Sequence, residues 1–275
     1  MDLNPAVKPE SPSRWPAALG LALLASAAIA QDTDQRAPYV ATPQEVVERM
    51  LALAGTRGED FVIDLGSGDG RIVIAAAEKF GARGLGVEIE PELVAASREN
   101  ARRAGVGGRV RFEQRDVLET DLSQATVVTI YLLPWLVDRL QPKLLHELAP
   151  GARIVAHAFP MKGWKPDRVE RLRVARPRDR QTGESELYLW IVPAPARGTW
   201  RAEGWDLRVH QNYQEIEIEA IIDGRPQVVN QARLAGSEIS FSAGEAFFRG
   251  RVEGRTIAGT LTRPSGTATI TFARN

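Results

Sequence analysis

The pattern of apolar and polar positions divides the chain into three stretches. Residues 17–30 form an unbroken run of small apolar residues, preceded by Lys8 and Arg14. From residue 31 to about residue 195, short β-branched runs alternate with longer segments of helical periodicity, which is typical of a parallel sheet wound with helices. Residues 197–275 contain only short alternating stretches separated by glycine turns, which predicts a separate all-β unit.

The first stretch resembles a secretory leader. Its apolar run ends in Ala28-Ile29-Ala30 before polar residues, which fits an A-x-A cleavage site, and it is shorter than the roughly 20 residues that a membrane-spanning helix needs. We therefore expect residues 1–30 to be a signal peptide and the chain to be exported, to the periplasm. An N-terminal membrane anchor and a cytoplasmic location are the alternatives.

The middle stretch, residues 31–195, predicts an α/β domain. Its first helix is expected after Thr42-Pro43, with Thr42 as the N-cap and Pro43 at the first helical position. The expected strands are Phe61–Asp64, Gly84–Glu88, Val110–Phe112, Thr126–Tyr131 and Arg153–Phe159, the helices lie near 71–80, 91–104 and 135–148, and Val169–Ala175 and Glu186–Val192 form a hairpin-like pair.

The last stretch, residues 197–275, predicts a small antiparallel β-domain, either a meander or a partly closed barrel. The segment Pro193-Ala194-Pro195-Ala196 interrupts the preceding pattern and marks the boundary. The expected strands are Glu215–Ile221, Val228–Leu234, Ile239–Phe241, Ala246–Val252, Ile257–Leu261 and Ala268–Phe272. No group of titratable residues in this stretch indicates catalysis.

Composition removes several classes of function. The 35 Lys and Arg balance 35 Asp and Glu, which argues against a nucleic-acid partner, because phosphate binding needs a surplus of positive charge. The chain has no cysteine, which excludes disulfides, cysteine-bound zinc and thiolate nucleophiles. Its three histidines, His146, His157 and His210, are scattered, so no metal site is expected.

The most informative segment is a glycine loop directly after the first predicted strand. Gly66, Gly68 and Gly70 alternate between the strand Phe61–Asp64 and the helix near 71–80. Glycines at such a junction allow a tight turn and let a ligand touch the backbone, and the helix that follows offers unpaired N–H groups. The sequence therefore predicts a ligand at this loop.

The neighbouring residues indicate which ligand the loop holds. The spacing is neither the G-x-G-x-x-G of a dinucleotide fold nor a phosphate loop with Lys, and Asp64 and Asp69 would repel a polyphosphate. Glu88 ends the second strand, where a carboxylate can accept ribose hydroxyls. Asp116 follows the third strand, where an acid can accept from an adenine amino group. An ammonium, a ribose and an adenine together describe S-adenosylmethionine.

The segments VIDLGSGDGR, VGVEIE and QRDVLETDL resemble the first three motifs of the class I, seven-strand S-adenosylmethionine-dependent methyltransferases. The resemblance runs from about Tyr39 to Val192 and implies a Rossmann-like methyltransferase sheet. It places at the cofactor Asp64, Gly66, Ser67, Gly68, Asp69, Gly70, Glu88, Asp116, Val117 and Tyr131.

A narrower resemblance links the PYVATP segment at residues 38–43, the DLGSGDGRIVIAAA loop and the AFP segment with Trp164 to the lysine methyltransferases of mitochondrial ATP-synthase c subunits and adenine nucleotide translocases, and to their bacterial relatives. The export leader and the β-domain depart from that family. Candidate acceptor-binding residues are Tyr39, Thr42, Pro134, Trp135, Phe159 and Trp164, because aromatic walls suit a cationic amine.

Several of these residues also have simpler interpretations. Trp135 can pack on the core at a helix start, and Trp164 can lie buried against the hairpin. His157 lies inside an apolar strand and is interpreted as a core or supporting histidine. Residues 161–180 carry eight basic and three acidic residues, which would suit an acidic substrate or a nearby anionic membrane, although charged strand edges that resist aggregation explain them as well.

The expected reaction is direct methyl transfer to an amine, with a protein lysine as the favoured acceptor and no assigned catalytic residue. Two alternatives stay open: a small-molecule methyltransferase, and an exported binding protein that keeps the fold without turnover. The oligomeric state is not predicted.

Overall fold

The protein is described by a computed structural model that covers residues 39–175 and 182–275. The predicted leader, residues 1–30, lies outside the described residues and stays a prediction. The elements are α1 (Gln44–Leu53), β1 (Phe61–Leu65), α2 (Arg71–Phe80), β2 (Arg83–Glu88), α3 (Pro91–Arg103), β3 (Val110–Gln114), the 3₁₀ turn η1 (Val117–Glu119), β4 (Val127–Ile130), α4 (Pro134–Glu147), β5 (Arg153–His157), β6 (Arg168–Ala175), β7 (Thr182–Ile191), β8 (Gly198–Ala202), β9 (Trp205–Asn212), β10 (Glu215–Ile222), β11 (Arg225–Gln227), β12 (Val229–Ala235), β13 (Glu238–Ala243), β14 (Ala246–Glu253), β15 (Thr256–Arg263) and β16 (Gly266–Arg274). Among the described helices, none is long and apolar enough to cross a membrane.

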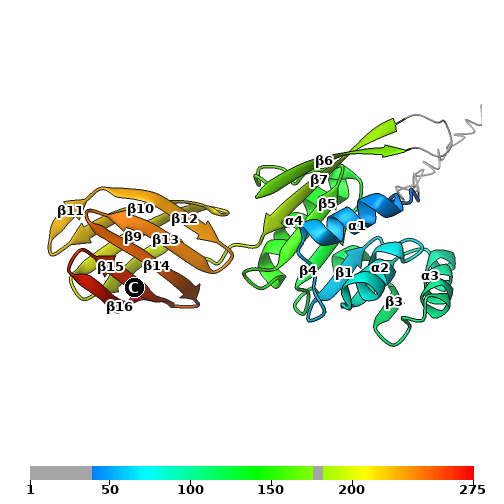
Figure 1. Cartoon of the computed structure of the whole chain (residues 1–275), viewed down its shortest axis with the longest axis horizontal. Coiled ribbons are helices and arrows are strands. Elements are labelled where there is room, and N and C mark those ends of the chain that lie inside the picture. Colours follow the sequence, from blue (N-terminus) through cyan, green and yellow to red (C-terminus); the bar gives the residue numbers. More distant parts are fainter. Residues whose placement is uncertain (1–38, 176–181) are drawn as a thin grey trace, which may run out of the picture. The chain divides into compact units, whose positions relative to one another are not determined.

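Strands β1 to β7 form one mixed sheet in the order β3-β2-β1-β4-β5-β7-β6 (Figure 1). The first five strands along the chain pair in parallel, and β7 joins β5 antiparallel, with β6 at the edge. This confirms the predicted Rossmann-like seven-strand methyltransferase sheet. The chain reverses its winding direction between β1 and β4, so a ligand crevice is expected at the carboxyl ends of these two strands.

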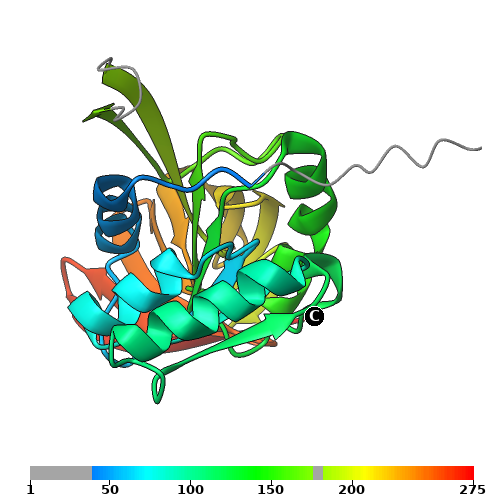
Figure 2. The ribbon, with the colours of Figure 1, turned by 90° about the vertical axis from the view of Figure 1, so that its right-hand side faces the viewer.

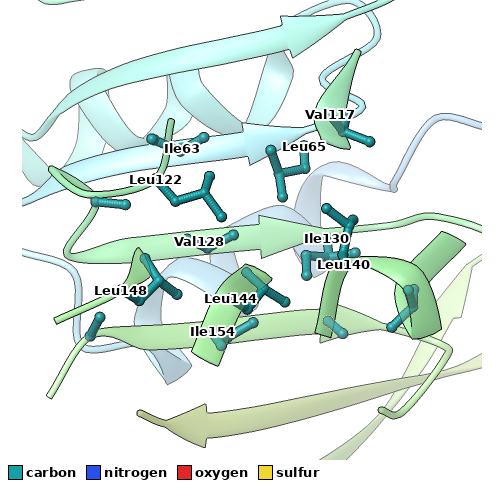
Figure 3. Close-up of a cluster of buried hydrophobic side chains, with 14 of the residues drawn as sticks. Ile63, Leu65, Val117, Leu122, Val128, Ile130, Leu140, Leu144, Leu148 and Ile154 are labelled. Atoms are coloured by element: carbon teal, nitrogen blue, oxygen red, sulfur yellow. The ribbon is translucent and has the colours of Figure 1, made fainter. Parts of the chain in front are cut away.

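Helices cover both faces of this sheet, as its buried strands require. Residues of α1 and α2 pack with Val62, Val127 and Val155 on one face. On the other face, α4 packs against the side chains that alternate with those, including Ile63, Val128 and Ile154 (Figure 3). The two clusters hold the carboxyl ends of β1, β4 and β5 in a fixed relation to one another.

The first helix differs from its prediction at the N-terminus. Helix α1 begins at Gln44 with Pro43 at the cap position and without a side-chain cap, so the assignment of Thr42 as N-cap is wrong. The N–H groups of Val46 and Val47 both donate to the Pro43 carbonyl, at 3.0 Å, so Pro43 is the residue that flanks the helix. The Thr42 hydroxyl lies 3.4 Å from Nδ1 of His157 instead.

Strands β8 to β16 form a second, antiparallel sheet in the order β11-β10-β9-β8-β16-β15-β14-β13-β12. Strand β12 also approaches β10, so the sheet is nearly closed. This confirms the predicted antiparallel β-domain. Alternate residues fill its interior, and the largest fully buried side chains there are Trp200, Phe241, Phe248 and Phe272.

Strands β8, β9 and β11 were not among the expected strands. The sequence of β9 nevertheless alternates, since Trp205, Leu207 and Val209 are buried between exposed polar residues. Period-two alternation of this kind is the ordinary signal of a strand with one buried face.

Candidate functional site

The glycine loop after β1 adopts the backbone that its sequence predicts. Gly66, Gly68 and Gly70 have φ of +79°, +53° and +82°, a region that other residues seldom adopt. The backbone N–H groups of Gly66 and Ser67 both donate to the carbonyl of Val87 on the neighbouring strand, at 2.9 and 2.8 Å. The loop is therefore held against the end of β2.

Glu88, at the carboxyl end of β2, is the main support of this loop. Its Oε2 accepts the backbone N–H of Gly68 at 2.9 Å. Its Oε1 accepts the N–H groups of Ile89 at 2.8 Å and Glu90 at 3.1 Å. A carboxylate offers about four lone-pair positions, so Glu88 can support the loop and still accept a ligand hydroxyl.

Asp64 lies beneath the loop at the end of β1 and is buried. It pairs in register with Thr129 on β4, whose hydroxyl donates to Asp64 Oδ1 at 2.7 Å. Burial is the main cause that raises the pKa of Asp64 to about 7; the nearby carboxylates of Glu88 and Asp69 add to the rise, and the Thr129 hydrogen bond opposes it. A cation that enters here would stabilise the charged form of Asp64.

This shift predicts that binding of a cationic donor depends on pH. A raised pKa means that the folded, ligand-free protein keeps the Asp64 proton up to about pH 7. The contribution of Asp64 to the free energy of unfolding is therefore lost as the pH rises from about 4 to about 7. Donor affinity has the opposite dependence, because the cation favours the carboxylate. We expect affinity to increase through pH 7 and then level off. Calorimetric titration of the donor from about pH 5.5 to about pH 8.5 measures this dependence. If donor affinity changed with pH by the same slope in the Asp64→Asn variant, the prediction would be contradicted.

The loop residues also leave unused hydrogen-bonding capacity. The Ser67 hydroxyl is buried without a hydrogen-bond partner among the described residues. Burial disfavours the charge of Asp69, but its hydrogen bonds from Arg71, at 2.6 and 2.9 Å, outweigh this and keep its pKa below the ordinary value. A free hydroxyl and carboxylates around a glycine backbone fit a polar, positively charged ligand such as S-adenosylmethionine.

Two further predicted cofactor residues lie after β3. Asp116 caps the 3₁₀ turn η1, and its Oδ1 accepts the N–H of Leu118 at 2.8 Å. Val117 is buried in the core cluster that includes Leu65 and Ile130 (Figure 3). Its side chain therefore supports the site from below, and the part of Val117 that a ligand could touch is the backbone.

Tyr131 follows β4 and is partly buried. Its ring lies against that of His157, with centroids 4.2 Å apart. His157 is buried at the end of β5, and burial lowers its pKa to about 4. The interpretation of His157 as a core or supporting histidine agrees with this position.

The predicted acceptor residues divide into two groups. Tyr39, Pro134 and Trp135 are exposed, with Trp135 at 40 % on the first turn of α4, and Phe159 is partly exposed just after β5. Thr42 and Trp164 are buried, at 4 % and 1 % exposed, and Trp164 contacts Trp190 at 6.2 Å between ring centroids. The structure thus places Trp164 in the core against the strand pair, the simpler of its two interpretations.

Two features near the site were not singled out from the sequence. Ile89 follows Glu88 and is 52 % exposed, so it offers an apolar surface beside the predicted ribose position. Ala158 has φ of +71°, an unusual backbone for a residue with a Cβ, and such strain concentrates at functional sites. The sequence could have indicated Ile89, because it is an apolar residue directly after the acid that ends a strand. Nothing in the sequence indicates the backbone conformation of Ala158.

Comparisons with known proteins agree with the methyltransferase fold and with S-adenosylmethionine as the cofactor. The family model described as ANTKMT methyltransferase domain matches residues 64–168. The protein-lysine N-methyltransferase of Saccharolobus islandicus (strain REY15A) is 46 % identical over 133 residues, which cover 48 % of this chain and 83 % of that relative. The human lysine N-methyltransferase that is named for the ATP synthase c-subunit is 39 % identical over 132 residues, which cover 48 % of this chain and 56 % of the human protein.

A solved structure described as an RNA methyltransferase from Salinibacter ruber, in complex with S-adenosyl-L-homocysteine, is 48 % identical. It covers 55 % of this chain and 93 % of its own, with a TM-score of 0.50. The strand order, the glycine loop and these likenesses lead to one conclusion: the chain belongs to the family of S-adenosylmethionine-dependent methyltransferases that carry the ANTKMT methyltransferase domain.

Proposed function

We propose that this enzyme transfers the methyl group of S-adenosylmethionine to the ε-amine of a protein lysine. The observation that carries the proposal is the 46 % identity to a protein-lysine N-methyltransferase of which this chain covers 83 %. The exposed aromatic residues Tyr39 and Trp135 near the carboxyl edge of the sheet support it, because aromatic faces attract an ammonium group.

Methyl transfer requires little more of the protein than alignment of the donor methyl group with the acceptor amine. The donor supplies a methyl group on a positively charged sulfur. The amine nitrogen forms a bond to the methyl carbon while the carbon–sulfur bond breaks, which leaves S-adenosylhomocysteine. Asp64, Glu88 and the glycine loop would orient the donor, and the residues after β4 and β5 would hold the amine in line and exclude water.

The acceptor lysine must be neutral before it attacks, and its ordinary pKa is about 10.4. His157 is not suited to remove the proton. Its pKa of about 4 makes it a weak base, and its side chain is buried. We therefore assign proton loss to water, helped by desolvation of the ammonium beside aromatic side chains.

The test is transfer of a labelled methyl group from S-adenosylmethionine to a lysate, with the Glu88→Ala enzyme as the inactive control. We expect label in protein, released as methyl-lysine after acid hydrolysis and resistant to ribonuclease. Label in RNA would favour the activity by which the Salinibacter ruber relative is described. Label in small molecules would favour a small-molecule acceptor, and either result overturns the lysine proposal.

A further inference from the structure

The segment of residues 39–42, here called the covering segment, lies against the glycine loop. A Cβ added to Gly68 would collide with Cε2 and Cδ2 of Tyr39, so the tyrosine ring rests directly on the loop backbone. Burial and the neighbouring Asp69 carboxylate raise the pKa of Tyr39. Figure 2 shows this blue segment running from α1 across the ends of the sheet strands.

Two contacts fasten the covering segment at Thr42. Nη1 of Arg71 donates to the Thr42 carbonyl at 2.9 Å, while the same guanidinium is held by Asp69. The Thr42 hydroxyl lies 3.4 Å from Nδ1 of His157, a residue 115 positions later in the chain. Thr42 is itself buried. One contact therefore joins the segment to the donor loop, and the other joins it to β5.

The His157 ring contacts three side chains, those of Thr42, Ser185 and Tyr131. Its Nε2 lies 3.2 Å from the Ser185 hydroxyl on β7, its face lies against Tyr131, and its backbone ends β5 just before the strained Ala158. Burial lowers the pKa of the ring and keeps it neutral. In the tautomer that donates from Nε2 to Ser185, Nδ1 is free to accept the Thr42 hydroxyl.

We propose that His157 is a positioning residue that fastens Thr42, and through it the covering segment, over the donor site. The same ring sets the orientation of Tyr131 at the end of β4. His157 touches neither the methyl group nor the acceptor in this role. The inference rests on donor binding alone and is independent of whether the acceptor is a lysine.

The decisive variant is Thr42→Val, which removes the hydroxyl at nearly constant volume. The matched control is Thr56→Val, since the Thr56 hydroxyl is also buried but has no hydrogen-bond partner among the described residues. We expect Thr42→Val to raise the dissociation constant of S-adenosylhomocysteine about five- to tenfold, the effect of losing one hydrogen bond. Thr56→Val is expected to leave it unchanged. Isothermal titration calorimetry of the full-length protein measures both.

A double-mutant cycle tests whether Thr42 acts through His157. If it does, Thr42→Val has little further effect on the dissociation constant in a protein that already carries His157→Asn, because the acceptor geometry at Nδ1 has already changed there. Hydrogen exchange of the backbone N–H groups in the covering segment gives a second readout, with faster exchange expected in both single variants. Equal binding by Thr42→Val and Thr56→Val, or effects of Thr42→Val and His157→Asn that add in full, would overturn the proposal. Because Thr42→Val is a conservative change, the comparison of Thr42→Val with Thr56→Val does not depend on whether the His157 variant folds.

Discussion

Replacing Glu88 with alanine is expected to lower the affinity for S-adenosylmethionine by at least about 100-fold. The Glu88 carboxylate accepts three backbone N–H groups, those of Gly68, Ile89 and Glu90. Hydrogen bonds to charged groups contribute about 1.5–3 kcal/mol each. Without the carboxylate, the glycine loop loses its support and the ribose loses its predicted acceptor. Calorimetric titration of the donor measures the loss.

Glu92→Ala provides the matched control for Glu88→Ala. Glu92 lies four residues later on the first turn of α3, where its side chain is exposed. The same change of charge and size there is expected to alter donor affinity by less than about twofold, because an exposed charge is screened by water and salt. Equal losses in the two variants would mean that overall charge, and not the loop geometry, controls binding.

Phe248→Ala is expected to destabilise the protein by about 3–5 kcal/mol, the usual cost of removing a buried phenylalanine ring. Phe248 is fully buried in the antiparallel sheet, with ring centroids 5.2 Å from Phe241 and 5.4 Å from Phe272. The free energy of unfolding from urea denaturation, followed by tryptophan fluorescence, measures the effect.

The preceding residue offers an unusually close control. Phe247 lies on the same strand, β14, but points to the other side and is 42 % exposed. Phe247→Ala makes an identical chemical change and is expected to cost less than about 1 kcal/mol, in the range of surface substitutions. A loss of similar size in both variants would contradict the strand register, because neighbouring residues of a strand face opposite sides.

The donor side of the site could be predicted from local sequence. An apolar strand, three alternating glycines and a following helix imply one turn geometry, because only glycine adopts the positive φ observed at Gly66, Gly68 and Gly70 without strain. Glu88 could be predicted for a similar reason: parallel strands end at a common edge, so an acid that ends β2 must lie near a loop that ends β1.

Which candidate acceptor residues are exposed could not be predicted, because their exposure depends on tertiary packing. Trp135 and Trp164 are both aromatic residues beside predicted strands, yet one is exposed on α4 and the other is buried against Trp190. No local pattern separates them, because burial of a loop residue depends on which distant surface covers it. The error at Thr42 has the same origin, since its hydroxyl contacts a ring on β5 and not the helix that follows it.

Local periodicity and backbone preference were thus sufficient for the alternation of strands and helices in the methyltransferase sheet, the glycine loop, the positions of Asp64 and Glu88 at strand ends, and the antiparallel character of the C-terminal sheet. They act between residues close in the chain, where each residue type constrains φ and ψ or the buried face. The neutral state of His157, its contact with Thr42 and the burial of Trp164 arose only when distant segments came together. Desolvation and long-range hydrogen bonds depend on neighbours that the chain supplies only after it has folded.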